Sequence, residues 1–350
     1  MTDTPDTDRE ALERRKDAHL DVVLNEAVGG GGPSIGLGRY TLEYDALPEL
    51  DLDEVDLSVE IFGKRLAAPI VIGAMTGGTA RAGEINRRLA RAAAKVGVGM
   101  ALGSQRAMIV KPELSASFAV REAAPDLPLV FGNVGAVQLN YGVDAGAIEA
   151  ALDAVSADAL NLHLNPLQEA VQPEGDTRFS GLSDKIAALV RALRVPVLAK
   201  EVGGGISART AKKLAALPLA GVEVAGTGGT SWAKVESFRG TEGSIQSEIG
   251  RRLAGFGVPT GESIVTCREA FGDRVVVGSG GIRTGMDVAV AIALGADVAA
   301  LAKPLLEAAN ESEEAAVRAL ELLVHELRVV CFCTGAKNVR ELRRVNVLAV

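Results

Sequence analysis

The chain has 350 residues, of which 48% are hydrophobic, and its formal net charge at pH 7 is −8. The length allows one large domain or two smaller ones. The acidic balance, without any basic stripe, argues against nucleic acid or an anionic membrane as a general partner, although an anionic small substrate would respond only to the local charges of a pocket. No run approaches 18 apolar residues, so no membrane span is predicted.

The three cysteines and the N-terminal segment both indicate the cellular compartment of the protein. Cys267, Cys331 and Cys333 have no zinc-type CxxC pairing, which favours a reducing compartment. The first residues are polar and acidic and lack the apolar core of a secretory signal. We therefore predict a cytoplasmic protein, with residues 1–10 disordered and the glycine run at 29–32 forming a mobile loop.

Eight short apolar runs follow an N-terminal stretch of about 65 residues, each with the length of a buried parallel strand. They lack the strict polar alternation of a half-exposed strand. We predict strands at residues 69–75, 98–103, 128–135, 159–164, 196–202, 221–226, 274–281 and 297–302.

Alanine-rich stretches between these runs predict helices at 81–96, 144–154, 182–194, 207–216, 260–271 and 284–294. Ser207 and Thr284 are suited to cap two of them, and Gly295 follows the last. Eight strands alternating with helices over roughly 240 residues are typical of a (β/α)₈ TIM barrel, and an open doubly wound sheet is the alternative. We predict one α/β domain, with an N-terminal extension (1–65) that contributes substrate-binding residues and a barrel with C-terminal helices (66–350).

Polar or glycine-rich residues stand at the end of every predicted strand, where the catalytic groups of a barrel lie. The seventh and eighth strands end in "GSGGIRTG" (278–285) and "ALAKP" (300–304). Glycines let backbone N–H groups approach a phosphate, and a following helix N-terminus favours an anion. This pair of strand ends predicts a phosphate site, although glycines can also serve only to make tight turns.

Lys200 ends the fifth apolar run, where its side chain would enter the barrel mouth. A buried lysine is unfavourable unless it meets an anion. A reduced flavin or a substrate phosphate would serve, and a purely structural alternative pairs Lys200 with Glu201 or Glu223.

The stretch "HLNPLQEAVQPEGD" (163–176) is unusually dense in polar groups, and its two prolines exclude one continuous helix. Glu169 and the neighbouring amides suit Mg²⁺, which keeps several waters and bridges to phosphates. A single histidine without cysteine is too few soft ligands for zinc. Near the N-terminus, Arg15, Lys16 and His19 lie on a predicted short helix, where the i, i+3/i+4 spacing puts one cation and His19 on a common face. They could form an anion site or a solvated basic patch.

Together these motifs resemble the type 2 isopentenyl-diphosphate isomerases, which are flavin enzymes. The resemblance runs over nearly the whole chain and is most specific in the 163–176 stretch. The other matching motifs are "RRKDAHL" (14–20), "AMTGG" (74–78), "GSQRAM" (103–108), "GNVGAVQ" (132–138), "AKEVGGGIS" (199–207), "GTGGTSW" (226–232), "SGGIR" (279–283) and "TGAKNVRELRRV" (334–345).

The resemblance implies a role for each matching residue. Gln168, Lys200 and His163 would be catalytic, and Glu169 would bind Mg²⁺. FMN would be bound by Ala74, Met75, Thr76, Ser104, Asn133, Lys200, Thr230, Gly281, Ile282, Arg283, Ala302 and Lys303. The substrate would be bound by Arg15, Lys16, His19, Ser104, Gln105, Arg106, His163, Asn165 and Gln168.

The implied reaction interconverts isopentenyl and dimethylallyl diphosphate in isoprenoid biosynthesis. Reduced FMN would serve as the acid–base catalyst without net redox change. NADPH would reduce the flavin for activation, and the enzyme would be a homo-oligomer, a tetramer or an octamer.

Three other functions are compatible with a flavin barrel. An FMN-dependent 2-hydroxyacid oxidase needs a histidine base after the seventh strand, where this chain has none. An enzyme like IMP dehydrogenase needs a cysteine after the sixth strand, and residues 227–256 contain none. A non-catalytic flavin store would have no use for Gln168 and the cations that follow the second strand.

Overall fold

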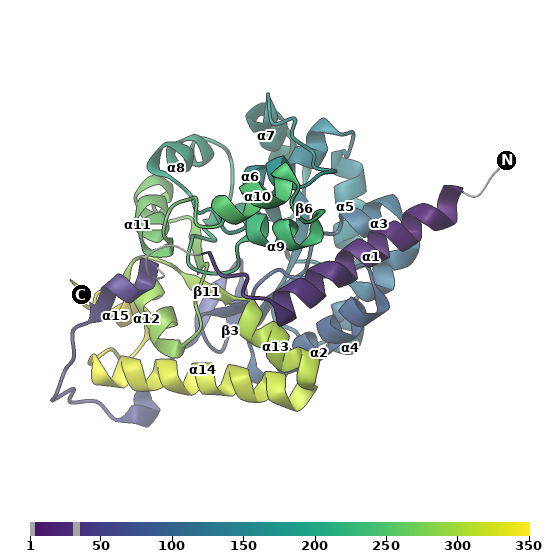
Figure 1. Ribbon diagram of the computed structural model, residues 1–350. Coiled ribbons are helices and arrows are strands. Elements are labelled where there is room, and N and C mark those ends of the chain that lie inside the picture. Colours follow the sequence, from purple (N-terminus) through teal and green to yellow (C-terminus); the bar gives the residue numbers. More distant parts are fainter. Residues whose placement is uncertain (1–3, 31–35) are drawn as a thin grey trace.

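The computed structural model describes residues 4–30 and 36–350 of the chain. Eight parallel strands close into a barrel in which each strand neighbours the next in sequence, and β11 returns to β4 (Figure 1). This arrangement confirms the predicted TIM barrel, and each strand lies within a predicted run. The strands are β4 (Ile70–Ile72), β5 (Gly99–Ala101), β6 (Val130–Gly135), β7 (Ala159–Leu164), β8 (Val197–Glu201), β9 (Gly221–Glu223), β10 (Val275–Ser279) and β11 (Val298–Leu301).

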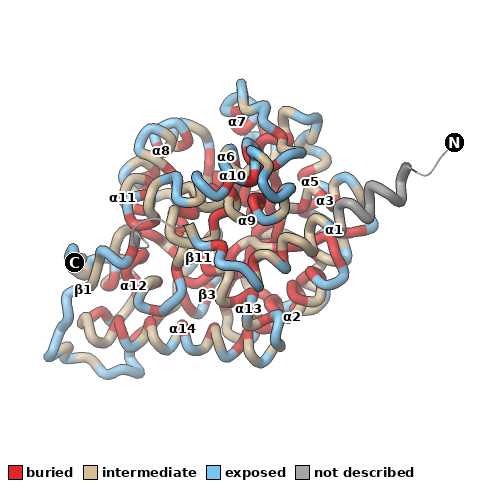
Figure 2. The backbone as a smooth tube through the Cα atoms, viewed as in Figure 1, coloured by how far each residue is buried: buried red, intermediate tan, exposed pale blue. Residues whose placement is uncertain are grey.

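The six predicted helices are all present around the barrel, and Figure 2 shows their inner faces buried and their outer faces exposed. They are α2 (Ala80–Val96), α5 (Ala145–Ala154), α7 (Leu182–Ala192), α8 (Ala208–Ala215), α11 (Thr260–Phe271) and α12 (Gly285–Ala293). The Ser207 side chain accepts a hydrogen bond from the N–H of Thr210, and Thr284 forms a capping box with Asp287. Both predicted caps are therefore confirmed.

A β-hairpin closes the amino-terminal end of the barrel. It consists of β2 (Val59–Ile61) and β3 (Lys64–Leu66), and Phe62 and Gly63 at its turn have positive φ. Ile61 and Leu66 are buried against residues at the starts of the barrel strands, including Phe131. The hairpin therefore fills the end of the barrel that lies opposite the carboxyl ends of the strands.

Helix α1 (Thr4–Asn25) packs on α9 (Trp232–Arg239) and α13 (Lys303–Glu311), at the opposite end of the barrel (Figure 1). The long helix α14 (Glu313–Cys333) packs on α2, α12 and α13. A short antiparallel sheet joins β1 (Tyr40–Leu42) to β12 (Val347–Ala349). The N-terminal extension therefore contacts both ends of the barrel.

The remaining elements are α3 (Arg106–Val110), α4 (Val120–Ala123), α6 (Pro166–Val171), α10 (Ile245–Arg252), α15 (Val339–Leu342), and the 3₁₀ turns at Gly36–Arg39, Leu52–Glu54, Pro112–Ser117 and Ala136–Asn140.

Three local expectations can be compared with the structure, and one of them needs correction. Helix α1 begins at Thr4, so the predicted disorder of residues 1–10 is wrong for 4–10, while 1–3 lie outside the described residues. The glycine run is described only at Gly29 and Gly30, whose backbones contact Thr230 and Gly229. The 163–176 stretch contains the short helix α6, which begins at Pro166, where proline is tolerated, and ends before Pro173.

Among the described residues, none of the helices combines the length and apolar character needed to cross a membrane.

Candidate active site

A cavity opens at the carboxyl ends of the barrel strands, beside helix α1. Every barrel strand contributes to its wall, either through its last residues or through the loop that follows. Parallel strands present their carboxyl ends at one face of the barrel, which explains why residues far apart in sequence meet here. All the predicted site residues except Gln105 line the cavity: Arg15, Lys16, His19, Ala74, Met75, Thr76, Ser104, Arg106, Asn133, His163, Asn165, Gln168, Glu169, Lys200, Thr230, Gly281, Ile282, Arg283, Ala302 and Lys303.

The floor of the cavity holds a buried ion pair. Lys200 Nζ lies 2.5 Å from Glu223 Oε1 and donates to the carbonyl oxygen of Glu201 at 3.0 Å. The Glu223 carboxylate also accepts hydrogen bonds from Ser279 Oγ and Asn161 Nδ2, both at 3.0 Å. Of the two carboxylates considered as partners for Lys200, the structure selects Glu223, and Lys200 keeps its place in the cavity wall.

His163 is held as a neutral imidazole. Burial, assisted by the positive charges of neighbouring cations, lowers the pKa of His163 to about 3. Its Nδ1 lies 2.8 Å from Asn133 Oδ1, while Asn133 Nδ2 donates to the carbonyl of Leu102. Since the Asn133 oxygen can only accept, Nδ1 carries the proton and Nε2 is an acceptor. His163 therefore presents Nε2 to the cavity as an acceptor for a hydrogen bond from a ligand.

Three cations converge on the outer part of the cavity. Burial, followed by the charges of Arg15 and Arg106, lowers the pKa of Lys16 to about 8. Burial and Arg106 also lower the pKa of Arg15, whose Nε is buried without a hydrogen-bond partner among the described residues. Like charges gathered in a partly buried place repel one another unless an anion joins them. The cluster formed by Arg15, Lys16 and Arg106 is therefore suited to bind an anion.

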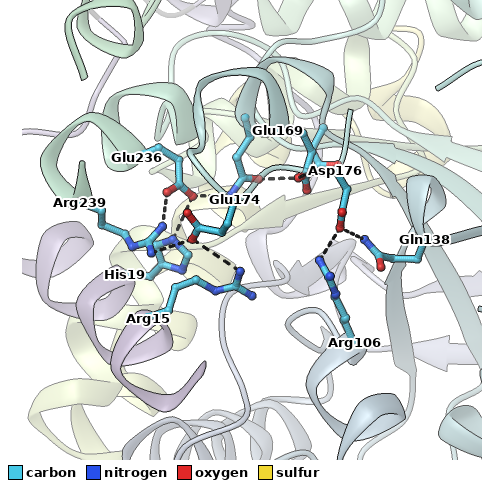
Figure 3. Close-up of polar contacts among 11 residues, drawn as sticks. Arg15, His19, Arg106, Gln138, Glu169, Glu174, Asp176, Glu236 and Arg239 are labelled. Atoms are coloured by element: carbon cyan, nitrogen blue, oxygen red, sulfur yellow. Dashed lines mark hydrogen bonds and ion pairs between the residues drawn. The ribbon is translucent and has the colours of Figure 1, made fainter. Parts of the chain in front are cut away.

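Carboxylates of the loop after α6 partly offset this charge (Figure 3). Arg106 Nη1 lies 2.6 Å from Asp176 Oδ2, which also accepts from Gln138 at 2.9 Å. The half-exposed Glu174 lies 3.8 Å from Arg15 and 3.2 Å from Arg239. The pairs of Glu174 are partly exposed and therefore weak, so a multiply charged anion could displace them.

Glu236 on α9 joins three side chains at the edge of the cavity (Figure 3). Its Oε1 lies 3.0 Å from His19 Nε2 and accepts from Gln168 Nε2 at 2.9 Å, and its Oε2 pairs with Arg239. Although burial raises the pKa of Glu236, the hydrogen bond and charge of His19 and the charge of Arg239 hold it below its ordinary value. Glu236 therefore fixes the orientation of both His19 and the Gln168 amide.

Glu236 and Arg239 were not among the predicted site residues, because the apolar pattern did not indicate α9. A signal was present: Ser231 caps this helix, and Glu236 lies four residues after Trp232, on the same helical face. Trp232 also packs edge-on against His19, with ring centroids 5.3 Å apart.

Glu169 and Asn165 form an oxygen-rich corner. Asn165 Nδ2 donates to Gln168 Oε1 at 3.1 Å and to Glu169 Oε1 at 2.8 Å. These bonds fix the amide, and its Oδ1 is buried without a hydrogen-bond partner among the described residues. Burial raises the pKa of Glu169 although the N–H of Asp176 donates to it. A carboxylate and a free amide oxygen suit a hard cation such as Mg²⁺.

No group of three or more histidine, cysteine, aspartate or glutamate side chains in the described part of the chain could hold a metal ion by itself. Any Mg²⁺ near Glu169 would complete its coordination with water and ligand oxygens, as this ion commonly does.

The loops after β9 and β10 pack backbone against backbone. Gly280 and Gly281 have φ of +103° and +76°, and a Cβ at Gly281 would lie 2.5 Å from the Gly228 carbonyl oxygen. Only glycine fits such a conformation and approach. Arg283 donates to the carbonyls of Gly281 and Gly228, and α13 begins beside it at Lys303 without a side-chain cap. This cradle of backbone and cations is suited to a phosphate group.

The predicted substrate contact of Gln105 is wrong. Its side chain is fully buried outside the cavity, where Nε2 donates to the carbonyl of Ala151 and Oε1 accepts from the N–H of Asn133. The chain turns into α3 at this point, which directs Gln105 into the layer between β6 and α5. Gln105 therefore supports the Asn133–His163 pair from behind.

The barrel, the glycine-rich cradle suited to a phosphate and the buried lysine are together compatible with a flavin-binding enzyme. The sequence model of the FMN-dependent dehydrogenase family matches residues 36–115 and 146–348. The chain belongs to this family.

Relatives place the chain more narrowly. A protein from Nostoc sp. (strain PCC 7120) named isopentenyl-diphosphate delta-isomerase is 47% identical over 337 residues, which cover 96% of both chains. Proteins of the same name from Mycolicibacterium vanbaalenii and Rickettsia felis are 48% and 42% identical and cover 98% and 99% of both chains. Within the larger class, the chain is a member of the isopentenyl-diphosphate delta-isomerases, as the motifs indicated.

Solved structures with a similar fold include a mandelate oxidase variant with a monooxide FMN adduct, at a TM-score of 0.68 and 22% identity over 98% of this chain and 100% of that one. The structure of mandelate oxidase with benzoyl-formic acid has a TM-score of 0.66 and 22% sequence identity, and the match covers 99% of both chains. At this identity the likeness concerns the fold alone.

Proposed function

We propose that this protein interconverts isopentenyl diphosphate and dimethylallyl diphosphate in the cavity at the carboxyl ends of its barrel strands. The observation that carries the proposal is the gathering of Arg15, Lys16 and Arg106 beside the Gln168–Glu169 corner, above a floor suited to a flavin. Its relatives' name describes this same reaction.

The residues of the cavity fit FMN at both ends. Backbone groups at Gly281 together with Arg283 and Lys303 would hold its phosphate, and Lys200 and Asn133 would meet the polar edge of its ring. Bound in reduced form, FMN supplies the acid–base group that adds a proton to the isoprenyl unit and removes one, without net redox change.

The chain's own residues bind, orient and exclude water. Arg15, Lys16 and Arg106 would hold the diphosphate, and Mg²⁺ on Glu169 would neutralise its remaining charge. Gln168, whose amide is fixed by Glu236 and Asn165, would face the isoprenyl unit. Leu20, Val23 and Trp232 line the cavity and would keep water from the reacting carbons.

The proposal extends to properties outside the site. NADPH is the proposed source of reducing equivalents, and the proposed assembly is a tetramer or octamer in the cytoplasm. We further propose that residues 1–65 act as an extension supplying substrate contacts to the barrel of residues 66–350; Lys16 and His19 in the cavity wall support this division.

The test uses purified protein, isopentenyl diphosphate and FMN, with and without dithionite. We expect dimethylallyl diphosphate only when the flavin is reduced and Mg²⁺ is present. Full activity with oxidised FMN or in excess EDTA would overturn the proposal. Oxidation of a 2-hydroxy acid with oxygen uptake would point to an oxidase instead, although residues 280–284 offer no histidine as its base.

A further inference from the structure

The carboxylate of Glu223 is one of the most thoroughly fixed charged groups among the described residues. It is 3% exposed and receives hydrogen bonds from three neighbouring strands: from Asn161 on β7, Lys200 on β8 and Ser279 on β10. Three donors on one carboxylate hold it in a single orientation.

Strand register explains why these groups meet. Lys200 and Glu223 are paired residues of β8 and β9, so both side chains stand at the same height inside the barrel. Ser279 Oγ accepts from the N–H of Ala225 at 3.0 Å, which directs its own proton to Glu223. The carboxylate therefore cannot turn away without breaking bonds on several strands.

The consequence is electrostatic. Lys200 and Glu223 both line the cavity, so a bound ligand faces the pair and not an isolated ammonium. Two opposite charges 2.5 Å apart oppose one another for a third group, so the buried pair acts on a ligand more weakly than either charge would alone.

We propose that Glu223 is a positioning residue that holds the Lys200 ammonium at the cavity floor and offsets its charge, so that the flavin meets a directed hydrogen-bond donor that belongs to a pair without net charge. The inference rests on the proposed binding of FMN. Reduced flavin carries more electron density than oxidised flavin, so a net positive charge nearby favours the reduced form. By offsetting the charge of Lys200, Glu223 would lower the midpoint potential of the bound flavin.

The experiment measures the midpoint potential of bound FMN by spectroelectrochemistry in four proteins: wild type, Glu223→Gln, Lys200→Gln and the double variant. Glu223→Gln keeps the shape of the side chain and removes its charge, and Lys200→Gln removes the charge with a shorter polar side chain. Glu223→Gln should move the potential to a more positive value and tighten the binding of reduced relative to oxidised FMN by roughly tenfold or more. Lys200→Gln should move it in the negative direction, and the double variant should return close to wild type.

Two comparisons separate positioning from a general structural role. Glu223→Asp keeps the charge and should keep the potential nearer to wild type than Glu223→Gln does. Glu169→Gln, a matched change in the same cavity without contact to Lys200, should move the potential much less than Glu223→Gln does. If Glu223→Gln does not fold, the double variant should still lie positive of Lys200→Gln.

An unchanged or more negative potential in Glu223→Gln, or an equal shift in Glu169→Gln, would overturn the inference. So would a double variant with the same potential as Lys200→Gln. Failure of the wild type to bind FMN would instead overturn the proposed function, which the flavin content of the purified protein shows before any potential is measured.

Discussion

At the scale of single residues, the charge of Lys16 links the cavity to pH. An ordinary lysine remains charged well above neutrality. Burial and two arginines lower the pKa of Lys16 to about 8, so its charge is present below that pH and is lost above it. Its attraction for an anion therefore weakens as the pH rises through 8.

The lowered pKa of Lys16 gives the first prediction. We expect kcat/KM for isopentenyl diphosphate to fall above about pH 8, since this quantity reports the free enzyme. Lys16→Ala should raise KM by roughly tenfold to a hundredfold, the loss of a charge-assisted contact worth about 1.5–3 kcal/mol, and should lack this alkaline fall. Arg106→Ala should keep the fall but move it to higher pH, because one lowering charge is gone.

FMN occupancy provides the control. It should be nearly unchanged in Lys16→Ala, whose side chain lies on α1 and away from the phosphate cradle. Isolation of that variant as apoprotein, or an alkaline limb identical to wild type, would show that Lys16 is misplaced.

The second prediction concerns two neighbouring residues with different proposed roles. Glu169→Gln keeps shape but removes the charge that a hard cation needs, so activity should fall and recover in part at high Mg²⁺. Gln168→Asn shortens the amide that bridges Glu236 and Asn165, so activity should fall without magnesium rescue. Activity measured against Mg²⁺ concentration decides between them, and equal rescue in both variants would contradict the division.

At the scale of elements, the β2–β3 hairpin is expected to contribute to the stability of the fold but not to catalysis. Leu66 is fully buried at the amino-terminal end of the barrel, whereas the cavity lies at the other end. The hairpin therefore contributes to the core without contacting the site.

We predict that Leu66→Ala lowers the free energy of unfolding by about 2–5 kcal/mol, the usual range for a buried leucine. FMN content and kcat of the folded protein should be nearly unchanged. Glu60→Ala, an exposed position on the same hairpin, is the matched control and should change stability by less than about 0.5 kcal/mol. Denaturant unfolding with a parallel activity assay measures both, and a loss of kcat at full occupancy would link the two ends of the barrel.

At the scale of the whole molecule, the site exists only because α1 and all eight strands meet. Ligands that span these elements should stabilise the folded state by mass action, by about 2.7 kcal/mol at a hundredfold excess over Kd. Binding should therefore be visible as thermal stabilisation.

We expect FMN to raise the melting temperature, and isopentenyl diphosphate to raise it further only with Mg²⁺ present. In Lys16→Ala the FMN shift should persist while the second shift shrinks. Thermal scans with each ligand added in turn provide the measurement. A full second shift in EDTA, or in the variant, would argue against a joint site of cations and metal.

Much of this architecture could be predicted because its signals are local. A buried parallel strand needs a short apolar run, and a cap needs one hydroxyl at the right place, so the strands, Ser207 and Thr284 were predictable. Strand ends of a parallel barrel share one face, which brought the predicted polar residues together without knowledge of any contact. The family resemblance followed from the same motifs.

What only the tertiary structure decided are the partners of those residues. Register pairs Lys200 with Glu223 and not with the carboxylate of the adjacent Glu201. Docking of α1 brings His19 to Glu236, 217 positions away, and a turn into α3 removes Gln105 from the cavity. Propensity and hydrophobic pattern act over a few residues, whereas the charge felt by each site residue depends on strand register and helix packing between segments far apart in the chain.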